Sequence, residues 1–291
     1  METSKIIEAL EELNMEYIVL SGSKEVEWAR ERIRLQNKLA EGILWYPAAR
    51  IRRKRALSKI PGKDHPVNWN EKQWKSLMHE GDPNKKYVVY SCITGGYDRA
   101  QKPTYYSDHC DYIMFLNSSS EQSINGWTVQ QIPKHIMDLN DNSKINRYIK
   151  MHPSEMFGGK YDFAIYIDGN VKPITDLSVL CELINGNIGI AVHHHCHKDN
   201  IYDEIRVCNI LKKGNTDALS HQGQRYRNEG FPEHFGMAEC NVIVTDLKSG
   251  EANKILRMWW EEFIHSNSGR DQISLPYVLW KTGHKMEEIT T

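Results

Sequence analysis

Two oxygen-bearing side chains follow a buried strand near the middle of the chain and could hold a divalent cation. The apolar strand 163–167 leads directly into Asp168, Gly169 and Asn170. Because Asp168 and Asn170 are two residues apart, both oxygens can face one side of an extended or tightly turned backbone. All three residue types also favour turns. The tripeptide by itself therefore permits either a plain turn or a metal site.

A glycine turn and two cations could supply what a diphosphate needs. Thr94 to Asp98 follows a predicted strand, and its adjacent Gly95 and Gly96 let the backbone approach a ligand closely. The GxGxxG and P-loop patterns do not occur there. Arg147 and Lys150 are three residues apart on a predicted helix, so they share a face that either meets a diphosphate or is ordinary surface.

Four histidines fall within five residues, at His193, His194, His195 and His197. Alternation along a strand would place three of them on one face, as a zinc site requires. One strand rarely completes a tetrahedral site without partners elsewhere, so we interpret this segment as a loop in which one or two histidines contact substrate. A zinc-dependent hydrolase that uses the HHHCH cluster is the alternative.

Strands and helices alternate along the part of the chain that carries these residues. Strands are predicted at 87–93, 111–116, 127–132, 163–167, 188–192 and 240–244. Helices are predicted at 142–151, 177–184, 200–211, 215–230 and 251–264, with a last one opened by Arg270, Asp271 and Gln272, and residues 231–239 are predicted as a loop. This pattern is typical of the α/β class, in which ligands bind outside the carboxyl ends of the strands.

The N-terminal part differs in character. Residues 1 to about 60 have helical periodicity and end in a basic cluster, Arg50 to Lys59, which is either a solvated face or a contact for a membrane surface. A Pro- and Gly-containing connection follows. We therefore predict a helical N-terminal extension and linker over residues 1–85 and an α/β domain over residues 86–291.

Bulk properties exclude several classes of protein. The 291 residues carry a formal net charge of -1, which gives no global attraction to nucleic acid. The apolar runs fall short of the roughly 20 residues of a membrane span, and the N-terminus lacks a signal-peptide layout. The six cysteines are widely spaced without a CxxC pattern, which favours buried free thiols in a reducing compartment. A cytoplasmic protein, with possible peripheral membrane contact, is the expectation.

Taken together, several blocks resemble one family. They are VVYSCITGGYD (88–98), NRYIKMHPSEMF (146–157), YDFAIYIDGNV (161–171), HCHKDNIYDE (195–204), GMAECNVIV (236–244), WWEEFI (259–264) and RDQISLPYVLW (270–280). As an ordered set they resemble the glycosyltransferase-like family, long described as a domain of unknown function, whose plant members are linked to mucilage and cell-wall polysaccharide. Bacterial and viral members are also similar.

The resemblance implies a GT-A-type, Rossmann-like fold with a mixed sheet flanked by helices, and a nucleotide-sugar donor, most simply a UDP-sugar, with Mn²⁺ or Mg²⁺. A saccharide acceptor and a role in surface polysaccharide or glycan synthesis follow from it. By position, the resemblance assigns nucleotide-sugar binding to Thr94, Gly95, Gly96, Tyr97, Asp98, Arg147, Lys150 and Gln272. It assigns acceptor contacts to His195, Lys198, Glu204 and Arg270, and metal binding to Asp168, Asn170 and His284.

Two carboxylates are candidates for stabilising the oxocarbenium character that develops during transfer, Asp271 and Glu239. Asp271 has a second interpretation, as an acid stabilised by the dipole of the helix it opens. Asn170 stands where many such enzymes carry a second carboxylate, and an amide oxygen brings no charge to a metal. That departure raises the further alternative of an inactive transferase fold that serves as a binding protein.

Overall fold

The computed structural model describes residues 51, 55, 81–117, 121–184, 187–195 and 198–291. Contacts divide the chain into two compact units, Met1–Ser58 and Lys59–Thr291, and the strands and helices below belong to the second. Of the helical extension and linker predicted over residues 1–85, the structure describes residues 51, 55 and 81–85, so most of that prediction, including most of the basic cluster from Arg50 to Lys59, lies outside the described residues. Among the described helices, none is long and apolar enough to cross a membrane.

Within the described part of the chain, the strands form one mixed sheet in the order β3-β4-β2-β1-β5-β7-β6. They are β1 (Tyr87–Ile93), β2 (Cys110–Leu116), β3 (Ser123–Ile124), β4 (Trp127–Gln131), β5 (Phe163–Ile167), β6 (Ile190–His194) and β7 (Ala238–Asp246). β1 is parallel to both β2 and β5, whereas β7 is antiparallel to its neighbours β5 and β6. The α/β fold with a mixed sheet flanked by helices, expected from the sequence, is confirmed.

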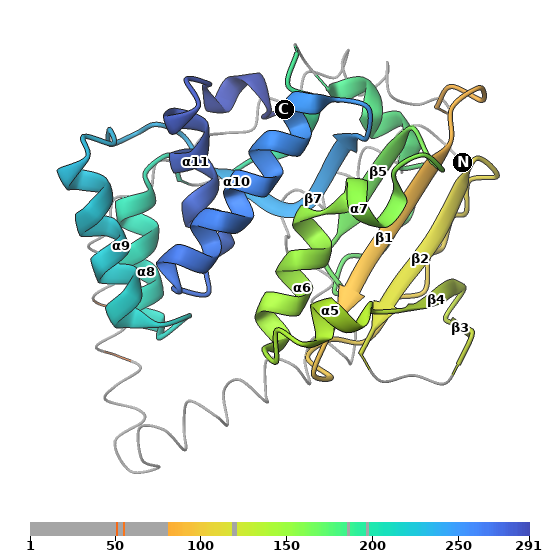
Figure 1. The fold of residues 1–291 in the computed structure, drawn as a ribbon, viewed down its shortest axis with the longest axis horizontal. Helices are drawn as coiled ribbons and strands as arrows, with labels where there is room; N and C mark the ends of the chain where they lie inside the picture. The colour runs from red at the N-terminus through yellow and green to blue at the C-terminus, as the bar shows by residue number, and fades with distance from the viewer. Residues whose placement is uncertain (1–50, 52–54, 56–80, 118–120, 185–186, 196–197) are drawn as a thin grey trace. The chain divides into compact units, whose positions relative to one another are not determined.

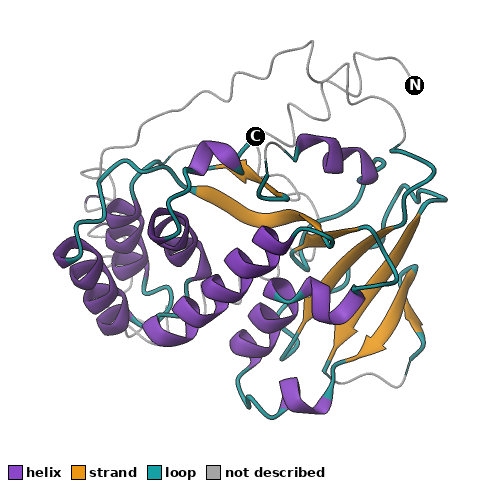
Figure 2. Cartoon of the chain, turned by 45° about the horizontal axis from the view of Figure 1, so that its top comes forward, coloured by secondary structure: helices purple, strands orange, loops and turns teal. Residues whose placement is uncertain are grey.

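Helices cover the sheet and extend beyond it. They are α5 (Lys134–Met137), α6 (Asn142–Met151), α7 (Pro153–Phe157), α8 (Ile201–Leu211), α9 (Thr216–Asn228), α10 (Gly250–Ser266) and α11 (Asp271–Lys281), with 3₁₀ turns η2 (Ser178–Leu183) and η3 (Met286–Glu288). Figure 1 shows α6 and α10 crossing the same face of the sheet. The two views agree that α8, α9 and α11 form a group on the far side of β7 from β2 and β4 (Figures 1 and 2).

The core has one cluster on each face of the sheet. Tyr90 and Tyr166 pack on the face covered by α6 and α10, together with Trp259. Val89 and Ile165 pack on the opposite face, which η2 covers. β1 is buried at every position, as expected for a central strand of a parallel region whose two faces are both covered.

Local signals explain where the helices begin. The Asp141 side chain accepts hydrogen bonds from the backbone N–H groups of Ser143 and Lys144, so α6 starts at the residue that periodicity predicts. Asn200 and Ser249 cap α8 and α10 in the same way. These caps fix the register of each helix against the sheet, and with it the direction in which its polar residues point.

Several expectations need correction. β6 spans Ile190–His194, so His193 and His194 belong to a strand, whereas the sequence predicted a strand at 188–192 followed by a loop that carries the histidines. The α-helix predicted at 177–184 is instead the short 3₁₀ turn η2, Ser178–Leu183. The Asp176 carboxylate accepts hydrogen bonds from both Ser178 N and Ser178 Oγ at its start. β7 begins at Ala238 because His193 pairs with Glu239, which places Glu239 in a strand and not in a loop. β3 is only two residues long and was not predicted.

The expectation of buried free thiols is confirmed for the described cysteines. Cys92, Cys110, Cys181, Cys208 and Cys240 are all buried and unpaired. Cys196 lies outside the described residues.

Candidate functional site at the carboxyl ends of the strands

Strand direction brings the candidate residues to one edge of the sheet. β1 and β5 are parallel, so Thr94 and Asp168 follow them at the same edge. β7 is antiparallel to β5, with Ile167 opposite Val242, so its first residues, including Glu239, start at this edge. β6 runs against β7 and ends there too, just before His195. Segments far apart in the sequence thus meet where an open α/β sheet binds ligands.

The turn after β1 is held by α6. Gly95 and Gly96 both have φ of +62°, a conformation that favours glycine. Thr94 Oγ1 donates a hydrogen bond of 2.7 Å to the carbonyl oxygen of Asn142. A Cβ on Gly95 would lie 2.5 Å from the Asn142 side-chain amide, so glycine lets the turn approach this side chain without displacing it. Tyr97 is 62% exposed at the tip of the turn.

The Asp168–Asn170 segment is a turn and also borders the glycine turn. The Val171 N–H donates to the Asp168 carbonyl at 2.8 Å, which closes it. A Cβ on Gly169 would lie 2.6 Å from Ile93 Cγ1 and 3.2 Å from Asp98 Cβ, so this glycine lets the two segments pack together. The turn interpretation is therefore confirmed, and the same turn packs Gly169 against Asp98, while the metal site stays a prediction.

Asp168 is oriented from within the sheet. The Tyr166 hydroxyl donates a hydrogen bond of 2.9 Å to Asp168 Oδ1, and the Asp168 N–H donates to the Asn241 carbonyl at 2.8 Å. Asp168 is half-buried and Asn170 is exposed. Tyr166 was not among the predicted site residues, although its position two residues before Asp168 on a strand places both on one face.

Two cations and a carboxylate form a buried cluster on the same face of the sheet. Lys150 Nζ lies 2.7 Å from Asp271 Oδ2, with side chains 2% and 5% exposed, and Arg147 Nε lies 3.0 Å from the same oxygen. Lys150 Nζ also lies 5.2 Å from the centroid of the Tyr166 ring and 5.6 Å from that of Trp259. The shared helical face predicted for Arg147 and Lys150 is therefore real, and it faces a carboxylate.

Electrostatics in this cluster favour the ionised forms. Burial would raise the pKa of Asp271, but Arg147 and Lys150 outweigh it and hold that pKa well below its usual range. Burial would lower the pKa of Arg147, but Asp271, Tyr166 and Asp168 raise it by more, so the pKa lies above its usual value. Arg147 is thus a permanent cation that is paired with Asp271 and also attracted by the Asp168 carboxylate.

Asp271 occupies a different place from the one its predicted catalytic role requires. It is 4% exposed, and one of its oxygens contacts both cations. Its backbone carbonyl accepts a hydrogen bond from Trp259 Nε1 at 2.8 Å. These contacts make Asp271 a counter-ion that orients Arg147 and Lys150, rather than a group that reaches a substrate. The buried Trp259 thus holds the backbone of Asp271 in place.

The predicted acceptor residues form two adjoining groups. His195 Nε2 lies 3.4 Å from Glu239 Oε1. Glu204 is buried, contacts Lys198, and lies 3.4 Å from Arg270 Nη2. Burial would raise the pKa of Glu204, but the two cations lower it.

Gln272 links these groups to β7. Its Nε2 donates to the Ala238 carbonyl at 2.9 Å, and its Oε1 accepts from Arg270 at 3.4 Å. The cations Arg270 and Lys198 therefore lie near the start of β7, where Glu239 also lies.

His284 is not brought to this edge. Its ring nitrogens lie 3.2 Å from Glu251 Oε1 and 3.3 Å from Glu288 Oε2. Glu251 is near the start of α10, which follows the end of β7, and that end pairs with the first residue of β5. Within the described part of the chain, the partners of His284 thus belong to α10 and η3 and not to the turn that carries Asp168 and Asn170.

Metal-binding capacity at the site comes from oxygen ligands. No group of three or more His, Cys, Asp or Glu side chains arranged for a metal occurs within the described residues, whereas Cys196 and His197 of the HHHCH cluster lie outside them. Within the part of the chain that the structure describes, the Asp168 side chain accepts one hydrogen bond, through Oδ1, and Asn170 is exposed. Mg²⁺ and similar cations often bind one or two protein oxygens and complete their shell with substrate phosphates. The donor set fits that mode.

Comparison with known proteins gives one family match. The family model described as TOD1/MUCI70, glycosyltransferase-like domain, matches residues 75–290. No curated protein matches the chain significantly. Similar solved structures include apo mouse xyloside xylosyltransferase 1, with 9% identity over 71% of this chain and 84% of that chain and a TM-score of 0.41.

Two further similar structures are transferases. One is the galactosyltransferase LgtC in complex with donor and acceptor sugar analogues, with 14% identity over 65% of this chain and 69% of that chain and a TM-score of 0.38. The other is the mannosyltransferase Ktr4p of S. cerevisiae, with 10% identity over 79% of this chain and 74% of that chain and a TM-score of 0.36. Because these TM-scores are low, the assignment of the chain to a family rests on the family-model match over residues 75–290.

Proposed function

Because the chain belongs to the TOD1/MUCI70 glycosyltransferase-like domain family, as its sequence motifs predicted, we propose that it transfers a sugar from a nucleoside-diphosphate sugar to a saccharide acceptor. The donor is most simply a UDP-sugar. The product belongs to surface polysaccharide or glycan synthesis.

The observation that carries this proposal is the pair of oriented cations at Asp271, of which Lys150 lies over the ring of Tyr166, the residue whose hydroxyl binds Asp168. When the bond between the anomeric carbon and the diphosphate breaks, negative charge builds up on the leaving phosphate. Arg147 is fixed by Asp271 at 3.0 Å and Lys150 by the same carboxylate at 2.7 Å, so neither has to reorganise during the reaction. Preorganised charge of this kind often makes the main contribution to catalysis. Arg147, whose side chain is 21% exposed, is the cation that reaches the diphosphate.

The donor nucleotide would bind along the turn Thr94–Asp98. The left-handed Gly95 and Gly96 expose backbone N–H groups, and the exposed Tyr97 ring offers a surface for the base. Asp98 lies against Gly169, so the ribose and the diphosphate would span the short distance between the two turns.

Asp168 and Asn170 would hold Mn²⁺ or Mg²⁺ with the diphosphate oxygens completing the shell. Such an ion would neutralise charge on the leaving group. Asn170 contributes an oxygen but no charge, so the protein holds the cation weakly until the nucleotide binds.

Glu239 is the carboxylate that we assign to act on the acceptor. Its Oε1 lies 3.4 Å from His195 Nε2, and its side chain is 14% exposed at the sheet edge. A carboxylate paired with a histidine can take the proton of an attacking hydroxyl. In the proposed reaction the acceptor oxygen bonds to the anomeric carbon, its proton passes to the Glu239–His195 pair, and the diphosphate leaves with the electron pair.

Thermal stability tests this proposal. UDP with Mn²⁺ at a hundredfold excess over Kd should stabilise the chain by about 2.7 kcal/mol. Asp168→Ala should remove the metal-dependent part of this shift, while the matched control Asp217→Ala, on the exposed start of α9, should retain it. If no nucleoside diphosphate shifts stability, with or without metal, the proposal is wrong. Binding without turnover of any sugar nucleotide would identify an inactive transferase fold.

A further inference from the structure

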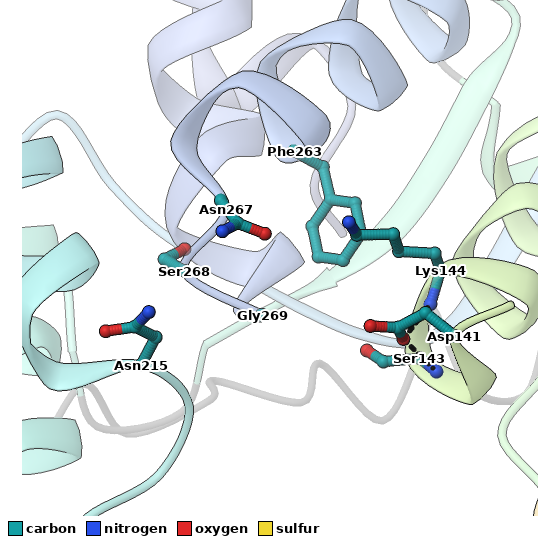
Figure 3. Close-up of a pocket in the computed structure, with 8 residues that line it drawn as sticks. All are labelled: Asp141, Ser143, Lys144, Asn215, Phe263, Asn267, Ser268 and Gly269. Atoms are coloured by element: carbon teal, nitrogen blue, oxygen red, sulfur yellow. Dashed lines mark hydrogen bonds between the residues drawn. The ribbon is translucent and has the colours of Figure 1, made fainter. Parts of the chain in front are cut away.

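A pocket opens beside this cluster, between the start of α6 and the loop that joins α10 to α11 (Figure 3). Its volume is about 230 Å³, and it is lined by Asp141, Ser143, Lys144, Asn215, Phe263, Asn267, Ser268 and Gly269. Pockets for drug-sized ligands measure roughly 300–1,000 Å³. This one therefore suits a single ring-sized group rather than a nucleotide.

The charges in the pocket argue against an anion. Asp141 and Lys144 are the ionisable residues among those that line it, so their charges cancel. Asp141 Oδ1 accepts from Ser143 N at 2.8 Å and from Lys144 N at 3.0 Å. A carboxylate thus already occupies the N-terminus of α6, where an anionic ligand would otherwise bind.

The lining side chains keep hydrogen-bonding capacity for a neutral ligand. Among the described residues, no hydrogen bond involves the side chains of Ser143, Lys144 or Asn267, which bond to the protein through their backbone groups. Asn215 uses its amide oxygen to cap α9, which leaves its NH₂ group available. Hydroxyl, amide and ammonium groups can together satisfy a ligand that both donates and accepts, as sugar hydroxyls do.

An aromatic ring completes the pocket. Figure 3 shows the Phe263 ring between Asn267 and Ser268 on one side and Asp141, Ser143 and Lys144 on the other. Phe263 is only 3% exposed, so its ring is held rigidly by the core. Because it is almost fully covered, the Phe263 ring closes one wall of the pocket, and the polar groups around it are the ones that can contact the hydroxyl groups of a sugar.

The pocket lies within reach of the reaction centre. Lys144 precedes Arg147 by one helical turn, a rise of roughly 4.5 Å along α6. Gly269 directly precedes Arg270 and Asp271 at the start of α11. A ring in the pocket would therefore lie next to the two segments that supply the cations facing the diphosphate and their counter-ion.

We propose that this pocket binds a neutral sugar ring of the acceptor saccharide. The assignment of this sugar to the acceptor rests on the proposed function, whereas the binding of a sugar in the pocket does not. The pocket excludes anionic ligands by its Asp141 carboxylate and recognises hydroxyl groups through Ser143, Asn215 and Asn267.

A double variant, Ser143→Ala with Asn267→Gly, tests the proposal without disturbing the fold. Asn267 has φ of +48°, which glycine adopts readily, so the end of α10 is preserved while the amide is lost. Asn125→Gly is the matched control, because Asn125 also has a left-handed φ of +49° but lies on the β3–β4 turn.

Saturation-transfer NMR with methyl glycosides of neutral hexoses and pentoses gives the readout, with UDP and inorganic phosphate as anionic probes. We expect neutral glycosides to bind the parent chain and Asn125→Gly, and to bind the double variant about tenfold more weakly, since two hydrogen bonds are lost. UDP binding should be the same in all three proteins.

The proposal is overturned if no neutral glycoside binds the parent chain, or if the double variant binds glycosides equally well. It is also overturned if the double variant loses affinity for UDP or phosphate, because the pocket would then belong to the donor. A chain that binds glycosides in this pocket but no nucleoside diphosphate would contradict the proposed function and leave the sugar site standing.

Discussion

Replacing Asp271 with asparagine isolates the charge that holds the cationic cluster together. The substitution keeps the shape of the side chain but removes the negative charge that contacts Lys150 Nζ at 2.7 Å and Arg147 Nε at 3.0 Å. Lys150, with 2% of its side chain exposed, would remain as a buried cation without its counter-ion. Removing one partner of a buried ion pair costs about 3–5 kcal/mol. A typical domain has only about 5–15 kcal/mol of stability, so the loss is large.

Urea unfolding followed by tryptophan fluorescence measures the effect, because the buried Trp259 donates a hydrogen bond to the backbone of Asp271. Glu261→Gln is the matched control. Its ion pair with Arg257, at 4.0 Å with side chains about two-thirds exposed (67% and 66%), should contribute at most about 0.5 kcal/mol. A loss in Asp271→Asn no larger than that of Glu261→Gln would refute the buried-cluster reasoning.

The pH dependence gives a second check on the same variant. The native pKa of Asp271 lies below its unfolded value of 3.8, since the cations outweigh the burial that would raise it. A carboxylate with a depressed native pKa stabilises the fold fully above its unfolded pKa and loses that contribution as the pH falls toward the native value. The difference between parent and Asp271→Asn should therefore be constant above about pH 5 and shrink below about pH 4. A difference that stays constant through this acid range would contradict the assignment.

Three further substitutions test the site. Arg147→Ala should lower kcat by roughly 10²–10³-fold, because one oriented donor to the leaving diphosphate is lost. Steady-state kinetics measure this effect, and an unchanged kcat would remove Arg147 from the mechanism. Gly169→Ala should cost about 1–3 kcal/mol in urea unfolding, since its Cβ would lie 2.6 Å from Ile93 Cγ1. Gly250→Ala, at the start of α10 with no atom within 4 Å of the added Cβ, is the control and should not destabilise. Asn170→Asp should tighten Mn²⁺ binding in calorimetric titration because it adds a charged oxygen ligand, and unchanged affinity would place the metal elsewhere.

Residue patterns predicted most of the fold because local and tertiary signals agree there. β1 and β5 have the predicted bounds, as does α6, whose start is set by the Asp141 cap. Where local signals are weak the predictions miss. The segment 177–184 tightens into a 3₁₀ turn, and β3 is too short to show a period.

The site was only partly predictable, because a sequence names residues but not the direction in which their atoms point. The spacing of Arg147 and Lys150 correctly placed them on one face, yet it could not reveal that the same face meets Asp271. Asp271 is 121 residues from Lys150 along the chain, and only the packing of α11 against the sheet brings them together. The contacts of His284 with Glu251 and Glu288 were not predictable for the same reason, since chain order does not say at which edge of a sheet a late residue lies.

The most direct test of glycosyl transfer at this edge is the release of nucleoside diphosphate from a panel of sugar nucleotides. The parent chain should release diphosphate from at least one sugar nucleotide, slowly with water and faster with a saccharide acceptor. Asp168→Ala and Arg147→Ala should abolish that release while their circular dichroism spectra stay native. Release that continues at the parent rate in both variants, or its absence from the parent chain with every donor, would contradict the assignment of this edge as a glycosyltransferase site.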